Sequence, residues 1–233
     1  MPNKASKPIR IALLGAESTG KTSLSIAMTA ALRDLGQAAT TVPETLREWC
    51  LAHARTPDAR EQIQIAKAQA DAIFAIGTGW VIADTTSLMT AVYSDYFFQD
   101  QSLYEKTLAQ QSQFDLTLVM GLDVAWVPDG FQRDGEHVRA PVDTLIRHAM
   151  DSARLPFKVI YGQGEARLKA ALFAIQETLK VQLPLQTAWP QMKAAQGQRE
   201  ETQFGLNRGK TAWRCDLCSD SDCEHKLFSD LLK

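Results

Sequence analysis

Residues 9–24 read IRIALLGAESTGKTSL, and this stretch decides the fold. Ile9 to Leu14 is an almost wholly apolar run, which is typical of a strand buried on both faces. Gly15 to Thr22 fits the pattern G-x-x-x-x-G-K-[ST], and helix-forming residues follow to about Leu35, where Gly36 is expected to end the helix. A strand, a glycine loop and a helix in this order predict a phosphate-binding P-loop.

Each part of the predicted loop has a physical role. Gly15 and Gly20 let the backbone curl so that successive N–H groups face an anion, and the helix that begins near Lys21 adds its positive dipole end. Lys21 supplies a full charge near the β- and γ-phosphates, and the Thr22 hydroxyl can ligate Mg²⁺. The alternative is a glycine-rich turn before an ordinary helix, but the intact context favours binding of a nucleoside triphosphate with Mg²⁺. The residues expected to bind the nucleotide are Gly15, Glu17, Ser18, Thr19, Gly20, Lys21, Thr22 and Ser23.

The net charge and the lengths of the apolar runs disfavour several classes of function. The chain has 233 residues and a formal net charge of −2, so its overall charge does not favour nucleic acid or an anionic membrane surface. No apolar run approaches the ~20 residues of a membrane span. Residues 1–8 are short, polar and basic, and cleavage of a signal after them would destroy the P-loop strand. We therefore expect a cytoplasmic protein, in keeping with cysteines that read as metal ligands rather than disulfides.

A second strand is expected over 38–42, and PETLREW (residues 43–49) follows it. Ligands of parallel sheets lie at the carboxyl ends of the strands, where this segment places Glu44, Arg47 and Glu48. Glu44 and Arg47 are spaced i, i+3 on a helix, and Glu48 shares the face of Glu44. A solvated helix start is the alternative, but after a P-loop unit we expect substrate binding.

A third strand, Trp80-Val81-Ile82-Ala83-Asp84, ends in an acid. Asp84 downstream of a P-loop matches the Walker B arrangement, in which the carboxylate holds Mg²⁺. The alternative is that Asp84, Thr85 or Thr86 caps the next helix, and both roles can hold at once.

The rest of the first 182 residues alternates between helices and strands, which predicts one three-layer α/β domain with a parallel sheet. Between these elements, residues 126–139 read as a loop able to close over phosphates, with Arg133 and Arg139 placed to stabilise the transferring charge; a solvated loop is the alternative. Gly162-Gln163-Gly164 follows the last strand and suits a nucleotide-base edge, with Arg167 nearby. The expected elements are helices 58–76, 88–98, 102–113, 141–154 and 165–181, and strands 114–120 and 157–161.

The C-terminal part changes character. Residues 183–209 read as a linker or extended arm, and 210–233 as a separate small unit. Cys215, Cys218, Cys223 and His225 form C-x₂-C-x₄-C-x-H, which predicts a structural Zn²⁺ site; an iron–sulfur cluster or a disordered tail with incidental cysteines is the alternative. The unit is acid-rich, so residues 183–233 are expected to mediate docking or homo-oligomerisation rather than bind nucleic acid.

Together these motifs resemble the NadR-type ribosylnicotinamide kinases, a branch of the P-loop nucleoside kinases. The resemblance rests on GAESTGKTSL (15–24), PETLREW (43–49), ADTTSLMT (83–90), FDLTLVM (114–120) and WVPDGFQRDGEHVR (126–139). It implies a P-loop kinase fold with strand order 2-3-1-4-5, and transfer of phosphate from ATP to the ribose 5′-hydroxyl of nicotinamide riboside, giving nicotinamide mononucleotide.

The resemblance also assigns roles to residues. It implies that Lys21 and Thr22 hold phosphates and Mg²⁺, that Asp84 completes the metal site, and that Glu44 faces the ribose as the base. The same resemblance places Arg47 or Glu48 beside Glu44, Arg133 and Arg139 in a lid, and Trp49 or Trp126 against the pyridinium ring, whose positive charge favours an aromatic face.

The chain also departs from the family pattern. Larger members carry an adenylyltransferase or DNA-binding domain, for which residues 1–8 leave no room, and Arg133 stands one residue later than the pattern expects. The arm and the zinc unit lie outside the pattern.

Three other functions compete with this assignment. The first is a kinase of another nucleoside or vitamin-like alcohol on the same scaffold. The second is an ATP-binding switch that signals through the zinc unit; Gly121-Leu122-Asp123 lacks the N/T-K-x-D pattern of a guanine switch. The third is a nucleic-acid-associated ATPase, which the acidic tail and negative net charge disfavour.

Overall fold

The computed structural model of the protein describes residues 7–53, 55, 57–126 and 136–185. Its centre is a sheet of five parallel strands in the order β2-β3-β1-β4-β5. This confirms the predicted α/β class and strand order. The strands are β1 (Ile9–Leu14), β2 (Ala39–Val42), β3 (Trp80–Asp84), β4 (Leu116–Met120) and β5 (Lys158–Ile160).

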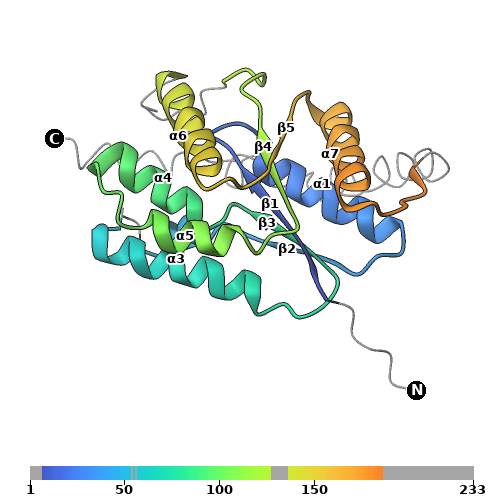
Figure 1. The fold of residues 1–233 in the computed structure, drawn as a ribbon, viewed down its shortest axis with the longest axis horizontal. Helices are drawn as coiled ribbons and strands as arrows, with labels where there is room; N and C mark the ends of the chain where they lie inside the picture. The colour runs from blue at the N-terminus through green and yellow to red at the C-terminus, as the bar shows by residue number, and fades with distance from the viewer. Residues whose placement is uncertain (1–6, 54, 56, 127–135, 186–233) are drawn as a thin grey trace, which may run out of the picture.

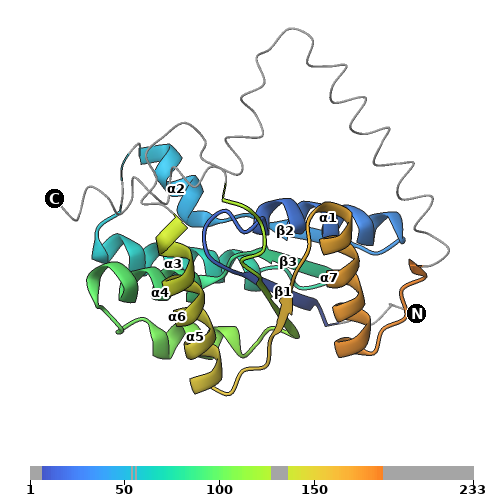
Figure 2. The ribbon, with the colours of Figure 1, turned by 90° about the horizontal axis from the view of Figure 1, so that it is seen from above.

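Helices cover both faces of the sheet, as Figure 1 and Figure 2 show. One face carries α1 (Lys21–Asp34) and α7 (Gly164–Leu179). The other carries α3 (Ala59–Phe74), α4 (Ser87–Phe98), α5 (Tyr104–Gln111) and α6 (Arg139–Ser152), while α2 (Thr45–His53) packs on α3. A short 3₁₀ turn, Glu136–Val138, precedes α6. The predicted three-layer fold is therefore confirmed.

The apolar run of β1 is explained by burial on two sides. Ile11 and Leu13 pack in the layer of α1 and α7, and Leu14 packs in the cluster that includes residues of α4 and α6. All three side chains are completely buried, and each such residue contributes roughly 1.5–3 kcal/mol to folding. The P-loop thus begins from a strand that cannot shift without losing this core.

Capping residues set the ends of two helices that flank the site. Gly36, with φ +77°, takes the left-handed conformation after α1, and the N–H groups of Gly36 and Gln37 donate to the carbonyls of Arg33 and Leu32. Gly36 therefore ends the helix as predicted. Asp58 caps α3 and forms a reciprocal capping box with Glu61.

Two stretches differ from the sequence-based expectation. Helix α6 begins at Arg139 rather than at Pro141, because a proline is tolerated in the first turn, where its missing N–H has no intrahelical partner. Residues 183–185, expected in the arm, continue the core: Leu183 is buried, and its carbonyl accepts a hydrogen bond from Gln176. Within the described ranges, no helix is long and apolar enough to cross a membrane.

Candidate active site

Three strand ends bring the predicted site residues to one edge of the sheet. β1 leads into the P-loop, and Asp84 at the end of β3 lies in register with Leu13, two residues before Gly15. In the next strand, Val42 pairs with Ala83, so Glu44 follows β2 just beyond this level. Folds with a parallel sheet bind their ligands at its carboxyl edge. Asp84 and Glu44 lie at this edge, where the sequence predicted them.

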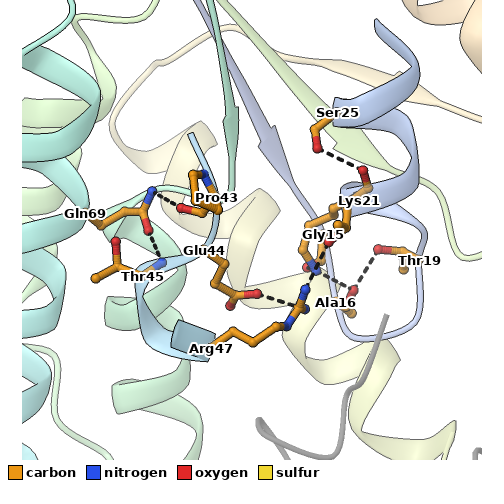
Figure 3. A network of polar contacts seen from close by, with 11 residues as sticks. Gly15, Ala16, Thr19, Lys21, Ser25, Pro43, Glu44, Thr45, Arg47 and Gln69 are labelled. Carbon is orange, nitrogen blue, oxygen red and sulfur yellow. Dashed lines mark hydrogen bonds and ion pairs between the residues drawn. The ribbon is translucent and has the colours of Figure 1, made fainter. Parts of the chain in front are cut away.

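The P-loop folds around the ammonium group of Lys21. Lys21 Nζ donates to the carbonyls of Gly15 (2.8 Å) and Ala16 (3.0 Å), and Thr19 Oγ1 also donates to Ala16 O (2.7 Å), as Figure 3 shows. A side chain cannot replace the hydrogen of Gly15, since a Cβ there would lie 2.9 Å from Met120 Cβ and Thr19 Oγ1. Gly20, with φ +80°, supplies the left-handed turn into α1. The loop therefore has the curled backbone and helix start of an anion site.

The remaining predicted loop residues differ in accessibility. Glu17 is buried, Ser18 and Thr22 are half-buried, and Ser23 is exposed. Ser18 has φ +52°, which is uncommon for a residue with a side chain and is characteristic of tightly curled functional loops.

A buried ion pair joins the two sides of the site. Glu44 is 5% exposed, and its Oε2 lies 2.9 Å from Arg47 Nη2. Arg47 Nη1 also reaches the P-loop and donates to Thr22 Oγ1 at 3.2 Å. The predicted i, i+3 pair is confirmed, and its partner on the P-loop is the hydroxyl expected to ligate Mg²⁺.

Gln69 of α3 fixes the backbone on either side of Glu44. Its Oε1 accepts from Thr45 N–H at 2.7 Å, and its Nε2 donates to Pro43 O at 3.2 Å. These bonds hold the start of α2 against α3, so the carboxylate of Glu44 is positioned by a buried amide rather than by a solvated loop. The predicted alternative of a solvated helix start does not fit this burial.

Other predicted substrate residues lie in different surroundings. Glu48 is exposed and does not share the buried environment of Glu44. The half-buried Trp49 ring stacks on His53, with centroids 4.0 Å apart, and the Arg55 guanidinium lies 4.8 Å from its centre. Trp126 is half-buried at the last described position before residue 127.

The structure shows which of the polar residues at the end of β3 caps the next helix, α4. Thr86 caps α4, since its Oγ1 accepts from Leu88 N–H at 3.3 Å and donates to Gln111 Oε1 at 2.7 Å. Asp84 is 2% exposed at the strand end, and Thr85 between them has φ +70°, a strained value for a β-branched residue. Thr86 therefore fills the capping role. A carboxylate such as that of Asp84 and a hydroxyl such as that of Thr22 are hard oxygen groups of the kind that Mg²⁺ prefers.

Arg167 and Asp123 form a second ion pair, which contacts the P-loop. Arg167 is 4% exposed; its Nη1 donates to Thr19 O and its Nη2 to Asp123 Oδ1 at 2.7 Å. Asp123 Oδ2 accepts from Gly162 N–H at 2.5 Å. Arg139 is also buried and donates to Val124 O at 3.0 Å.

The surroundings of Asp123 and Arg167 shift the pKa values of both side chains. Desolvation acts to raise the pKa of Asp123, but the hydrogen bond from Gly162, a local backbone bond and the Arg167 charge together hold that pKa below its ordinary value. Burial lowers the pKa of Arg167, and the nearby Arg139 charge acts in the same direction, whereas Asp123 opposes both. Asp123 is therefore the counter-charge that keeps a buried arginine beside the P-loop.

Three polar residues of the site region were missed by sequence reasoning: Gln69, Asp123 and Gln62. Asp123 was read only as part of an absent guanine motif. Gln62 of α3 is 2% exposed, and neither its Oε1 nor its Nε2 has a hydrogen-bond partner in the structure as described. A signal for Gln62 was present, since it precedes Gln69 by seven residues and so interrupts the same apolar helix face.

Several predicted residues lie outside the described part of the chain: Arg133 and the predicted zinc ligands Cys215, Cys218, Cys223 and His225. Within the described ones, no group of three or more His, Cys, Asp or Glu side chains could hold a metal ion.

The strand, glycine loop, lysine and helix define the P-loop class of proteins. The chain belongs to the AAA_28 family, whose model, described as an AAA domain, matches residues 10–167. No curated protein matches the chain.

Two solved structures of NadR proteins are similar. One, in complex with NR, matches with a TM-score of 0.61 and 21% identity over 76% of this chain and 52% of its own. The other, in complex with NAD and AMP-PNP, matches with a TM-score of 0.57 and 23% identity over 75% of this chain and 50% of its own. The chain spans about half the length of these proteins. At such identities the likeness shows a shared fold.

Proposed function

We propose that this chain is a P-loop kinase that transfers the γ-phosphoryl group of ATP to the ribose 5′-hydroxyl of nicotinamide riboside, giving nicotinamide mononucleotide. The observation that carries the proposal is the buried Glu44 carboxylate, which Arg47 links to Thr22 of the P-loop. A carboxylate held beside a phosphate loop is what transfer to an alcohol requires, since a hydroxyl must lose its proton as it attacks.

On the donor side, the P-loop N–H groups, the start of α1 and Lys21 bind the phosphates. Thr22 and Asp84 would hold Mg²⁺, which supplies positive charge for the β- and γ-oxygens when bound. Because Mg²⁺ and a guanidinium are both cations, we expect Arg47 to leave the Thr22 hydroxyl when Mg·ATP binds, while it keeps its ion pair with Glu44. Arg139 at the start of α6 and Arg133 are proposed to stabilise the transferring charge.

On the acceptor side, Glu44 accepts the proton of the 5′-hydroxyl. The bond from that oxygen to the γ-phosphorus forms, and the bond from the γ-phosphorus to the β,γ-bridging oxygen breaks, so that ADP leaves with the electron pair. Positioning and charge supply most of the rate in this chemistry, which fits a site made of a loop, a lysine, carboxylates and arginines.

Gln62 is proposed to recognise the base of the acceptor. It lies two helical turns, or ~10 Å, from Gln69 on the same face of α3. The other end of α3 lies at the amino edge of the sheet, where Phe74 meets the Arg10 guanidinium at 5.1 Å. Gln62 therefore stands beyond the carboxyl edge, on the side where ligands bind.

The chemistry of a buried amide fits this acceptor. An amide with an unpaired donor and an unpaired acceptor complements another carboxamide, and nicotinamide carries one on its ring. Burying such a group without partners costs about 1–3 kcal/mol for each unsatisfied atom, so it is retained at the expense of stability. The half-buried Trp126 is proposed to face the pyridinium ring, whereas Trp49 is already stacked on His53.

A structural zinc site at the four C-terminal ligands is a separate proposal, made on their spacing alone. It concerns assembly through residues 183–233 and takes no part in the phosphoryl transfer proposed above.

An acceptor screen tests the proposed function. The full chain is incubated with Mg·ATP and with nicotinamide riboside, the common ribo- and deoxynucleosides, or water alone, and ADP release is measured. We expect release that depends on nicotinamide riboside. Release with another nucleoside would replace the acceptor but keep the mechanism, and slow release indifferent to every acceptor would favour the ATP switch.

A further inference from the structure

The ion pair between Asp123 and Arg167 contacts the P-loop at the backbone carbonyl of Thr19. Arg167 comes from the first turn of α7, and Asp123 follows β4, so the pair links two segments that are distant in the sequence. Gly162, in the turn before α7, completes the set through its bond to Asp123.

Arg167 contacts the backbone of the loop at one peptide unit. Its Nη1 donates to Thr19 O, and a Cβ on Gly20 would lie 3.3 Å from the same nitrogen. The carbonyl of Thr19 and the N–H of Gly20 belong to one planar trans peptide, so they point in opposite directions. A carbonyl held toward Arg167 therefore aims the Gly20 N–H away from Arg167.

We propose that Arg167 and Asp123 are positioning residues for the nucleotide: they hold the Thr19–Gly20 peptide in the orientation that presents the Gly20 N–H to a phosphate oxygen. Arg167 acts through the backbone, and Asp123 acts through Arg167. The inference rests on the nucleotide-binding half of the proposed function and is independent of which acceptor is phosphorylated.

The geometry favours this role over two simpler ones. Arg167 is 4% exposed and already engages a carbonyl and a carboxylate, so it is not presented as a direct ligand of the base. An ion pair kept only for stability would need no contact with the loop, and the chain contains one for comparison: Asp143 and Arg147 pair at 2.7 Å along α6.

The test is the affinity for a fluorescent ATP analogue with Mg²⁺, measured on the full chain without any acceptor. The variants are D123A, D123N, R167A and the double variant D123A/R167A, with D143A as the matched control. We expect D123A and R167A each to weaken binding ~10- to 100-fold, the size of effect for a hydrogen bond to a charged group. The double variant should be no weaker than R167A, since both residues act on the same peptide. D123N keeps an oxygen for Arg167 and should lie between D123A and the wild type, and D143A should bind within about twofold of the wild type.

The failures of this inference and of the proposed function are distinguishable. A wild-type chain that does not bind the analogue would contradict the proposed function. Wild-type binding with D123A equal to D143A, or additive losses in the double variant, would overturn the positioning role alone. Should R167A fail to fold, D123A and D123N decide the question, because the Asp123 side chain is one-third exposed.

Discussion

Replacement of Gln62 by leucine is predicted to stabilise the folded protein and to weaken binding of the acceptor. Gln62 is 2% exposed with both amide atoms unpartnered among the described residues, and leucine fills a similar volume without polar atoms. Each unsatisfied buried polar atom costs about 1–3 kcal/mol, and Q62L removes two of them, so it should raise the free energy of unfolding by ~2–6 kcal/mol. In a domain of this size, 1 kcal/mol corresponds to about 2–4 °C in Tm.

Gln111 is the matched control. It is 3% exposed, and its amide is fully used: Oε1 accepts from Thr86, and Nε2 donates to Thr117 at 2.9 Å. Q111L leaves two buried hydroxyls without their partner, so it should lower the free energy of unfolding by ~1–3 kcal/mol. Urea unfolding without ligand, with the midpoint and slope compared at pH 7, measures both variants against the wild type.

The same Q62L variant also tests the proposed role of Gln62 in binding the acceptor. Loss of an amide that pairs with the acceptor's carboxamide should raise the KM for nicotinamide riboside ~10- to 100-fold, with the KM for ATP unchanged. Such a gain in stability at the expense of binding is the pattern of a functional residue. A destabilised Q62L, or an unchanged KM for the acceptor, would refute the reasoning.

The remaining predictions address the donor site, the base and the metal. K21A should lower turnover ~10²- to 10³-fold because the charge near the transferring phosphate is lost. Steady-state kinetics measure the loss, and an unchanged far-UV circular dichroism spectrum shows that the variant is folded. Turnover equal to that of the wild type would contradict the assignment of residues 15–22 as a P-loop. E44Q should lower kcat ~10²- to 10⁴-fold while ATP affinity stays within about threefold, since a base acts on the acceptor; equal losses in both would make Glu44 a structural residue. Metal analysis of the full chain should find about one zinc per chain, absent in C215S/C218S, and a metal-free wild type would refute the zinc proposal.

Local patterns in the sequence were enough to predict the sheet and the strand-end residues. The apolar run of β1, the glycines of the loop and the acid at the end of β3 each carry their own signal, whereas the strand order 2-3-1-4-5 came from the resemblance to the NadR-type kinases. Gly36 and the Glu44–Arg47 pair were predictable for the same reason, because their partners lie within a few residues.

What could not be predicted depends on residues far apart in the chain. Arg167 contacts Thr19, which lies 148 positions earlier in the chain, and Asp123, which lies 44 positions earlier. No local sequence pattern around any one of these residues indicates the other two. The family resemblance placed Trp49 or Trp126 against the pyridinium ring, but in the structure the Trp49 ring stacks on His53, one turn later. The spacing of Gln62 and Gln69 on one helix face could be read from the sequence, but the burial of Gln62 could not, since a glutamine on a helix is ordinarily exposed.

The central claim is that Glu44 and the P-loop act together on a ribose 5′-hydroxyl. The most direct test is the product formed from Mg·ATP and nicotinamide riboside, identified by mass and by the ³¹P signal of a 5′-phosphomonoester, beside a reaction with the 5′-deoxy analogue. We predict nicotinamide mononucleotide with one ADP per product from the riboside, and no transfer to the analogue. ADP release that is the same with the riboside, with its 5′-deoxy analogue and with water would contradict the account.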